Sequence, residues 1–372
     1  MKKKFLIIFG TRPEAIKMAP LTNQILADNR FETKVCVTGQ HREMLDQVLN
    51  FFDITPDYDL SLMKPNQNLY NLTGEVISGL KPILESFKPD YVFVHGDTTT
   101  TMAASIAGFY SGAKVCHVEA GLRTNNMLSP FPEEMNRQVA ARVATYHFAP
   151  TIKSQENLLK ENISQDNILV TGNTVIDALL ESSNRVENLE NEDIFELKKK
   201  LDFNKRILLV TGHRRENHGK GFINICAALK EIALKNLDIE VVYPVHFNPN
   251  VLQPVNELLG GIANIHLIKP LSYPSFVWLM NQSYLIITDS GGVQEEAPSL
   301  GKPVLVMRNT TERPEAVDAG TVILVGTDTN KIIKETQELL DNTTKYESMS
   351  SLHNPYGDGK ACKKIIDFIS KL

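Results

Sequence analysis

An α/β fold made of two Rossmann-like domains is predicted by two features of this 372-residue sequence. Short apolar runs alternate with segments of helical pattern from end to end, which is typical of βαβ units and mostly parallel sheets. A charged, strand-poor stretch at Glu181–Lys200, most polar at Asn184–Glu192, separates two such series. We expect the two domains to face each other across a ligand cleft, because ligands of such folds bind beyond the carboxyl ends of the strands.

The expected strands follow from apolar runs of strand length, each separated from the next by a segment long enough for a helix. In the first half they are Phe5–Phe9, Thr33–Thr38, Tyr91–His95, Lys114–Val118 and Tyr146–Ala149. In the second half they are Arg206–Val210, Ile239–Tyr243, Asn264–Leu267, Tyr284–Thr288, Pro303–Met307 and Val322–Val325. We expect residues 1–172 to form the N-terminal domain, with the helical segment 359–372 packing back on it, and residues 173–358 to form a nucleotide-binding domain. The stretch Glu181–Lys200 then holds the linker and a helix that leads into the second sheet.

Composition limits the class of protein. The formal net charge of −5 argues against a nucleic-acid or anionic-membrane surface, which needs a concentrated basic patch. The four cysteines are far apart and form no CxxC pair, so neither a disulfide framework nor a zinc site is indicated, and a reducing cytoplasm fits best. The apolar run at Phe5–Phe9 is too short for a signal peptide, and no stretch approaches the ~20 apolar residues of a membrane span.

The first strand leads directly into Gly10–Lys17. Gly10 allows a tight turn, and Pro13 suits a first helical position. Arg12 and Lys17 are cations beside a helix start, where backbone N–H groups already favour anions. Ordinary helix capping with solvated cations explains such a loop equally well. No GxGxxG follows this strand, so the dinucleotide fingerprint is missing and no redox cofactor is expected.

Acidic residues follow the expected strands Tyr91–His95 and Lys114–Val118 and begin a later helix. Asp97 follows a strand and opens a threonine-rich helix start, where it serves either as the N-cap or as a cleft residue beside hydroxyl groups. Glu119 comes just after a buried strand and needs a partner such as Arg123, or a ligand. Glu133 and Glu134 start a helix, where acids often only complement its dipole. Together these groups predict acid–base chemistry at one sheet edge.

The second domain places cations and glycines after its strands. His213 stands beside two arginines, which points to an anionic ligand, and the histidines here lack a zinc-like ligand set, so no metal is expected. Ser290, Gly291 and Gly292 join a strand to a helix as in a phosphate cradle, and Glu296 is placed to accept hydrogen bonds from a ribose. Further cations, Arg308 and Arg313, follow near the same edge.

Seven motifs in one order resemble the bacterial non-hydrolysing UDP-N-acetylglucosamine 2-epimerases. They are GTRPEAIKMAP, HGDTTTT, HVEAGLRT, SPFPEEMNRQ, TGHRREN, DSGGVQEEAPSLGKPVLV and TTERPEA. The resemblance extends from Gly10 to the closing NPYGDG at Asn354–Gly359. It implies the two-domain fold of the GT-B glycosyltransferases, a homodimer, and a role in supplying surface polysaccharide or capsule synthesis.

The resemblance also assigns residues by matched motif. The uridine and diphosphate contacts fall on Arg12, His213, Phe276, Ser290, Gly291, Gly292, Glu296 and Arg313, and Lys17 matches a substrate contact. Leu271 stands where many relatives have a side-chain amide, so its contact with the base is expected through the main chain. The catalytic carboxylates fall on Asp97, Glu119 and Glu133, with His213 assisting departure of the diphosphate. A second, activating substrate site matches Gln40, Glu134, Arg214 and His246, while Glu43 and Asn66 depart from the usual Gln and Arg.

The implied reaction is reversible inversion at carbon 2 of UDP-N-acetylglucosamine, giving UDP-N-acetylmannosamine. The proton at carbon 2 is not next to a carbonyl, so its removal needs cation-like charge at carbon 1 as UDP departs, with 2-acetamidoglucal as the intermediate. The expected ligands are therefore UDP-N-acetylglucosamine, UDP and UDP-N-acetylmannosamine. A hydrolysing epimerase that releases N-acetylmannosamine and a UDP-sugar glycosyltransferase are the alternatives, and a catalytically silent sensor is disfavoured because all three carboxylates are present.

Overall fold

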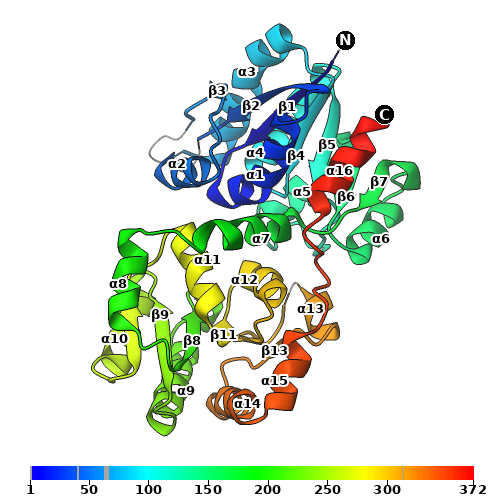
Figure 1. The fold of residues 1–372 in the computed structure, drawn as a ribbon. Coiled ribbons are helices and arrows are strands. Elements are labelled where there is room, and N and C mark those ends of the chain that lie inside the picture. Colours follow the sequence, from blue (N-terminus) through cyan, green and yellow to red (C-terminus); the bar gives the residue numbers. More distant parts are fainter. Residues whose placement is uncertain (1, 40–41, 63–66, 312) are drawn as a thin grey trace. The chain divides into compact units, whose positions relative to one another are not determined.

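The chain forms two compact units in the computed structural model, which describes residues 2–39, 42–62, 67–311 and 313–372 (Figure 1). Unit 1 comprises Met1–Ala178 and Tyr356–Leu372, and unit 2 comprises Leu179–Pro355. Helix α7 (Thr174–Val186) contains the first passage from unit 1 to unit 2, so this passage lies within a regular helix and not in a polar linker. The expected domain limits, at residues 172 and 358, stay a prediction.

Within the part of the chain that the structure describes, unit 1 contains a seven-stranded parallel sheet of order β3-β2-β1-β4-β5-β6-β7. Its strands are β1 (Lys3–Phe9), β2 (Phe31–Val37), β3 (Tyr58–Asp59), β4 (Tyr91–His95), β5 (Lys114–Val118), β6 (Tyr146–Ala149) and β7 (Ile168–Val170). Each strand predicted for this half is confirmed. The sequence pattern does not predict β3 and β7, because two or three residues are too few for a recognisable apolar run.

Helices cover the sheet of unit 1. They are α1 (Arg12–Leu26), α2 (Arg42–Phe51), α3 (Leu69–Phe87), α4 (Thr99–Tyr110), α5 (Glu133–Val143), α6 (Ile152–Lys160) and α16 (Ala361–Ser370), with the short 3₁₀ helix η1 (Gln165–Asn167). Helix α1 begins with a capping box, in which Thr11 and Glu14 satisfy each other's backbone N–H groups. Helix α16 (red in Figure 1) packs its Phe368 ring edge-on against Tyr146 and Phe148 of β6.

Over its described residues, 179–311 and 313–355, unit 2 contains a six-stranded parallel sheet of order β10-β9-β8-β11-β12-β13. Its strands are β8 (Arg206–Thr211), β9 (Ile239–Pro244), β10 (Ile265–Ile268), β11 (Leu285–Thr288), β12 (Val304–Val306) and β13 (Val322–Leu324), which confirms the predicted series. Its helices are α8 (Glu192–Lys200), α9 (Lys220–Lys235), α10 (Pro249–Leu259), α11 (Tyr273–Gln282), α12 (Gly291–Glu296), α13 (Pro314–Asp318), α14 (Thr329–Asp341) and α15 (Thr343–Ser350), with 3₁₀ helices η2 (Arg215–Asn217) and η3 (Ala297–Leu300).

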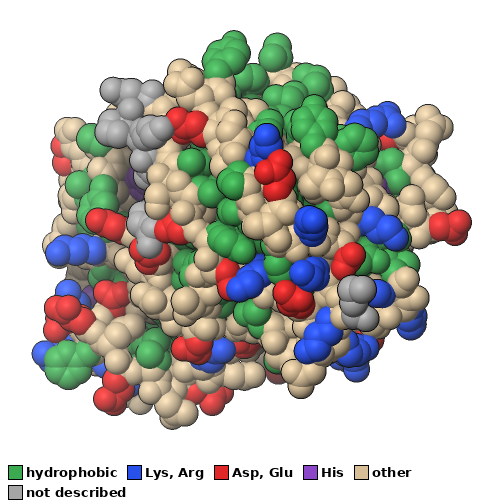
Figure 2. Space-filling model, turned by 90° about the horizontal axis from the view of Figure 1, so that it is seen from above, with side chains coloured by type: hydrophobic (Ala, Val, Ile, Leu, Met, Phe, Trp, Pro, Cys, Tyr) green, Lys and Arg blue, Asp and Glu red, His purple; other side chains and the backbone are tan. Residues whose placement is uncertain are grey.

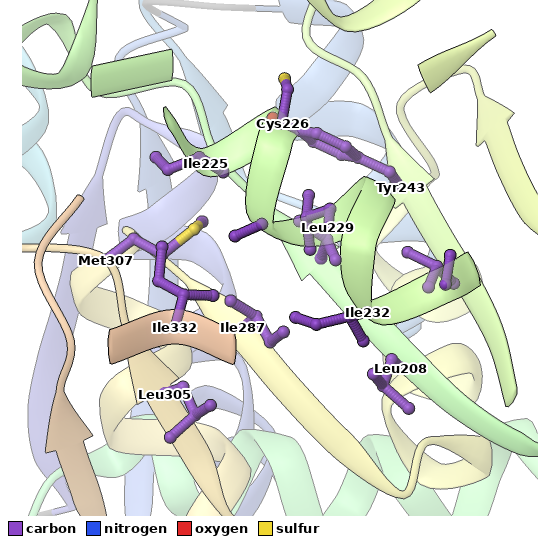
Figure 3. Packing of buried hydrophobic residues seen from close by; sticks show 14 of the residues in the cluster. Leu208, Ile225, Cys226, Leu229, Ile232, Tyr243, Ile287, Leu305, Met307 and Ile332 are labelled. Carbon is purple, nitrogen blue, oxygen red and sulfur yellow. The ribbon is translucent and has the colours of Figure 1, made fainter. Parts of the chain in front are cut away.

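The core of unit 2 lies between the sheet and its covering helices. Figure 3 shows Leu229 and Ile232 of α9 pointing toward Leu208 of β8 and Ile287 of β11. All four side chains are at most 1% exposed. Such burial removes apolar surface from water at about 25 cal/mol per Å², which makes the sheet a rigid base for the loops at its edges.

Both sheets have a topological switch point, where the order of strands reverses. In unit 1 it lies between β1 and β4, which pair in parallel from Phe5↔Tyr91 onward. In unit 2 it lies between β8 and β11, paired from Leu285↔Leu208 onward. Loops leave a switch point in opposite directions and open a crevice at the carboxyl ends of the strands. These edges are therefore where functional side chains are sought.

The surface carries both signs of charge. On the face seen in Figure 2, acidic and basic side chains are interspersed, and hydrophobic side chains gather near one edge. Among the described residues, no helix combines the length and the apolar character that crossing a membrane requires.

Candidate functional site

Asp97 lies at the carboxyl end of β4, and it is held by helix α5. Its Oδ2 accepts a hydrogen bond of 2.9 Å from Arg137 Nε, and its main-chain oxygen accepts one of 2.8 Å from Asn136 Nδ2. The N-cap of α4 is Thr98, whose hydroxyl accepts from Thr101 N. The interpretation of Asp97 as the N-cap is therefore wrong, and the carboxylate is left for another use.

Glu119 follows β5 with its backbone in the left-handed region, at φ 61°. Its Oε2 forms an ion pair with Lys17 Nζ and accepts a hydrogen bond of 2.8 Å from Asn173 Nδ2. Burial favours the neutral acid, but the charge of Lys17 outweighs this effect and holds the pKa of Glu119 well below its usual range. The prediction that Arg123 pairs with Glu119 is wrong, because the Arg123 guanidinium binds Glu161 instead, with 2.6 Å from Nε to Oε1.

Two observations place Glu119 beside Asp97. His95 of β4 is in register with Val118 of β5, so both acids leave neighbouring strands at the same edge. A Cβ atom added to Gly96 would lie 3.7 Å from Glu119 Oε1. The structure thus brings together two of the three acids predicted for catalysis, and the hydrogen bonds of α5 to Asp97 bring the helix start that carries the third.

Glu133 and Glu134 differ sharply in their surroundings, although they are adjacent at the start of α5. Glu134 is fully buried, and its oxygens accept from the main-chain N–H groups of Thr124 and Asn125 as well as from Arg137 and Gln138. These bonds anchor the loop before α5. Glu133 is half-buried and has no such set of donors among the described residues. Of the two, Glu133 is the group available for chemistry.

Glu14 is a buried acid in the first turn of α1. It accepts from the main-chain N–H groups of Gly10 and Thr11 and from the hydroxyls of Thr98 and Thr101. Burial raises the pKa of Glu14, although these hydrogen bonds favour its charged form. The carboxyl group therefore ties the turn after β1, next to the half-buried Arg12 at the start of α1, to the loop after β4.

The threonines after β4 are used inside unit 1. Thr100 and Thr101 are at most 1% exposed, and the Thr100 hydroxyl lies 2.9 Å from that of Thr38. A Cβ atom at Gly10 would lie 2.0 Å from the same Thr38 oxygen, so only glycine fits at this position. The expectation that these hydroxyls line a cleft is therefore wrong for Thr100 and Thr101.

His213 lies in the loop after β8, at the switch point of unit 2. This loop is organised by Asp289, which is fully buried and accepts through Oδ2 from the main-chain N–H groups of His213 and Arg214, at 2.9 and 2.8 Å. The Asp289 Oδ1 atom lies 3.8 Å from His213 Nδ1. Burial lowers the pKa of His213, and the charge of Asp289 opposes this. The sequence reasoning passes over Asp289, whose one available signal is an acid directly after a buried strand.

Helix α12 begins at Gly291 after its N-cap Ser290, whose side chain makes no capping hydrogen bond. A Cβ atom at Gly291 would lie 2.7 Å from Arg313 Cζ, so glycine leaves room for this guanidinium over the helix start. Arg313 is held there by Glu295, with a distance of 2.6 Å from Nε to Oε1. The guanidinium and the main-chain N–H groups of the helix start therefore lie at one place, which suits an anion.

The remaining predicted nucleotide contacts lie on nearby segments of unit 2. Glu296 ends α12, and its Oε1 would lie 3.2 Å from a Cβ atom at Gly292. Leu271 and Phe276 are half-buried, before and within α11. Their roles stay predictions.

The predicted second site is described only in part. Gln40 and Asn66 lie outside the described residues, and Glu43 is exposed in the first turn of α2. His246 stacks on His213 with ring centroids 5.3 Å apart. Arg214 is half-buried next to it. Glu134, the remaining member, holds the loop described above, so this site stays a prediction.

Comparison with known proteins gives one consistent family. The family model described as UDP-N-acetylglucosamine 2-epimerase matches residues 23–370. A UDP-N-acetylglucosamine 2-epimerase of Yersinia pestis is 60% identical over 365 residues, 98% of this chain and 97% of the relative. One of Campylobacter jejuni is 57% identical over 379 residues, 100% of this chain and 98% of the relative. The crystal structure of UDP-GlcNAc 2-epimerase from Neisseria meningitidis bound to UDP-GlcNAc superposes with a TM-score of 0.88 at 52% identity, covering 99% of this chain and 100% of that chain.

Proposed function

Because this chain belongs to the UDP-N-acetylglucosamine 2-epimerase family, we propose that it interconverts UDP-N-acetylglucosamine and UDP-N-acetylmannosamine by elimination and re-addition of UDP. The observation that carries this proposal is the set of carboxyl groups at one edge of the unit 1 sheet. Asp97 and Glu119 leave adjacent strands, and the helix start bearing Glu133 is bonded to Asp97. Inversion at carbon 2 needs a group that takes a proton from one face and a group that returns one to the other.

The proposed elimination breaks two bonds and forms one double bond. A carboxylate takes the proton from carbon 2, the electrons of that bond form the double bond between carbons 1 and 2, and the bond from carbon 1 to the diphosphate oxygen breaks. The products are 2-acetamidoglucal and UDP. In the reverse step UDP attacks carbon 1 while an acid delivers a proton to the other face of carbon 2. Electrons balance without an external oxidant.

The carboxyl groups are well prepared for these steps. Glu119 is ionised at neutral pH because Lys17 and Asn173 favour its charged form. Asp97 beside Arg137 is a second carboxylate held in a fixed direction. We assign Asp97, Glu119 and Glu133 jointly to proton transfer. Their order is left to experiment.

The departing diphosphate requires positive potential that is already in place. Arg313 supplies it in unit 2, together with the backbone at Ser290–Gly292, and His213 adds a positive charge when its ring is protonated. In unit 1, Arg12 and Lys17 lie at the start of α1. Uridine is assigned to Leu271, Phe276 and Glu296 as the resemblance implies. The proposed ligands are thus UDP-N-acetylglucosamine, UDP and UDP-N-acetylmannosamine.

Two other reactions would use the same nucleotide groups. A hydrolysing epimerase would let water take the place of UDP in the second step and release N-acetylmannosamine. A glycosyltransferase would need an acceptor, and its rate would depend on the acceptor concentration. The paired proton-transfer groups favour an epimerase over a glycosyltransferase, because transfer to an acceptor does not need carbon 2 to exchange its proton. Both kinds of epimerase need this exchange, and the resemblance favours the non-hydrolysing one.

The proposal also concerns the setting of the enzyme. We place it in the cytoplasm, where it would supply UDP-N-acetylmannosamine for surface polysaccharide. We further propose a homodimer. Exposed apolar side chains such as Phe109 and Tyr110, which are 58% and 76% exposed on α4, offer a surface that a second copy would cover.

Amide variants of the three acids test the assignment. Asp97→Asn, Glu119→Gln and Glu133→Gln keep size but remove the basic oxygen, so we expect turnover to fall by roughly 10²-fold or more. The dissociation constant for UDP should change far less. Glu85→Gln, on the exposed side of α3, is a matched control with normal turnover. Near-normal turnover in all three site variants would refute the proposed use of these acids.

A further inference from the structure

Asn173 donates a hydrogen bond to Oε2 of Glu119, the same oxygen that Lys17 of α1 contacts. It is 3% exposed and directly precedes α7. Its main-chain N–H donates to the oxygen of Tyr356 at 2.7 Å. Tyr356 is the first residue after the chain returns to unit 1. Asn173 is therefore anchored where both chain passages of unit 1 meet.

The orientation of the Asn173 amide is determined from both ends. Its Oδ1 accepts from Val175 N at 3.0 Å, as in an N-terminal cap of α7. Its Nδ2 must then point the other way, and it donates to Glu119 Oε2 at 2.8 Å. A flipped amide would lose both hydrogen bonds. The donor that faces Glu119 is thus built into the start of a helix.

Glu119 needs such a donor. Its backbone lies at φ 61°, a region that a non-glycine residue adopts only where its surroundings hold it. Its carboxylate is buried, and burial alone would favour the neutral acid. In the proposed complex Lys17 shares its charge with the substrate. The amide of Asn173 then remains as the permanent donor.

We infer that Asn173 is a positioning residue for the reaction: it orients the carboxylate of Glu119 and keeps it charged, ready to exchange a proton with carbon 2. The inference rests on the proposed catalytic use of Glu119. Asn173 does not touch the reacting atoms itself, and it acts through its neighbour.

The other groups that face Glu119 do not replace this donor. Lys17 approaches from α1, His95 from β4 and His117 from β5. Burial lowers the pKa of His95 and of His117 to about 4, so both rings are neutral at neutral pH. His95 Nε2 lies 3.7 Å from Glu119 Oε2, beyond hydrogen-bond distance. Lys17 and Asn173 are therefore the groups that stabilise the charged carboxylate at working pH.

Asn173→Asp tests this role with little structural change. The aspartate keeps the oxygen that accepts from Val175 N, but it replaces the donor with a second negative charge beside Glu119. Like charges raise the pKa of one carboxyl group, so the acid limb of the kcat profile should move to higher pH by about one unit or more. Asn173→Ser keeps a capping hydroxyl and is too short to reach Glu119. It should move the limb in the same direction by less.

Two measurements keep the test decisive. The titration of the Glu119 carboxyl carbon, followed by ¹³C NMR and assigned with Glu119→Gln, should shift upward in Asn173→Asp even if turnover is lost. Asn23→Asp, a residue of α1 whose amide donates to Phe52 O, gives the same change of net charge away from the site and should leave the profile unchanged. Unmoved titration and an unmoved pH profile in Asn173→Asp would overturn the inference. Normal turnover of Glu119→Gln would instead overturn the proposed use of Glu119.

Discussion

Asp289 and His213 form a carboxylate–imidazole pair in which the carboxylate is buried and the ring is accessible. The carboxylate is fully buried after β11, and its Oδ1 has no hydrogen-bond partner among the described residues. This uncompensated oxygen faces the His213 ring, 3.8 Å from Nδ1. A buried negative charge stabilises the imidazolium form. Asp289 therefore opposes the lowering of the His213 pKa by burial and favours the charged ring, which we propose binds the diphosphate.

Asp289→Asn tests this pair through the pH dependence of UDP binding. Burial, His246 and Arg214 all lower the pKa of His213, and Asp289 is the group that raises it. Removing its charge should lower that pKa further, so UDP binding should begin to weaken at a lower pH than in the parent protein. We expect the midpoint of the binding profile to fall by about half a pH unit or more.

Calorimetric titration of UDP between pH 5 and pH 8 gives this midpoint for both proteins. The asparagine can still accept from the N–H groups of His213 and Arg214, so the loop should keep its conformation. His213→Ala should bind UDP weakly across the whole range. An identical midpoint in Asp289→Asn and the parent protein would show that Asp289 has no electrostatic effect on His213.

At the scale of elements, the start of α12 depends on the absence of one side chain. The Arg313 guanidinium lies only 2.7 Å from the position that a Cβ atom at Gly291 would take. A Cβ atom essentially never lies this close to another atom, so an alanine here must shift the Arg313 guanidinium, which Glu295 holds over the helix start. Alanine itself is a good helix former, so the helix should persist.

Gly291→Ala should therefore weaken UDP binding without unfolding unit 2. We expect the dissociation constant to rise by about tenfold, which corresponds to about 1.4 kcal/mol. The control is Gly74→Ala within α3, where no atom lies within 4 Å of the added carbon. That variant should bind UDP normally and gain about 0.5–1 kcal/mol of stability. Unchanged UDP binding in Gly291→Ala would show that the position of Arg313 does not matter for binding of the nucleotide.

Elements were predictable from sequence where they are long and buried. Strands such as β4 and β8 are continuous apolar runs, and parallel sheets bury both faces of their strands. Strands β3 and β7 escape prediction because they contain two and three residues. Their pairing depends on neighbouring strands already being in place, which no local pattern records.

Site residues divide in the same way. Asp97 and Glu119 are visible because each follows a strand directly. Asn173 and Asp289 matter through partners that are 54 and 76 residues away in the chain. The wrong pairing of Glu119 with Arg123 has the same cause, since nearness in sequence favours Arg123 and the fold brings Lys17 instead. Long-range hydrogen bonds depend on the topology of the sheet.

At the scale of the whole molecule, each unit supplies one half of the proposed chemistry. Unit 1 holds the carboxyl groups that we propose for proton transfer, after β4, after β5 and at the start of α5. Unit 2 holds the groups that we propose for the nucleotide, at its β8–β11 switch point. The proposed reaction requires both kinds of group. Its intermediates must also be kept from water, since water would convert the epimerase into a hydrolase.

Exchange of hydrogen at carbon 2 tests the central claim most directly. The protein is incubated with UDP-N-acetylglucosamine in D₂O without NAD, and carbon 2 is followed by NMR. Elimination and re-addition predict UDP-N-acetylmannosamine that carries deuterium at carbon 2, and Glu119→Gln should incorporate it far more slowly. UDP-N-acetylmannosamine that keeps its original hydrogen at carbon 2 would contradict the account.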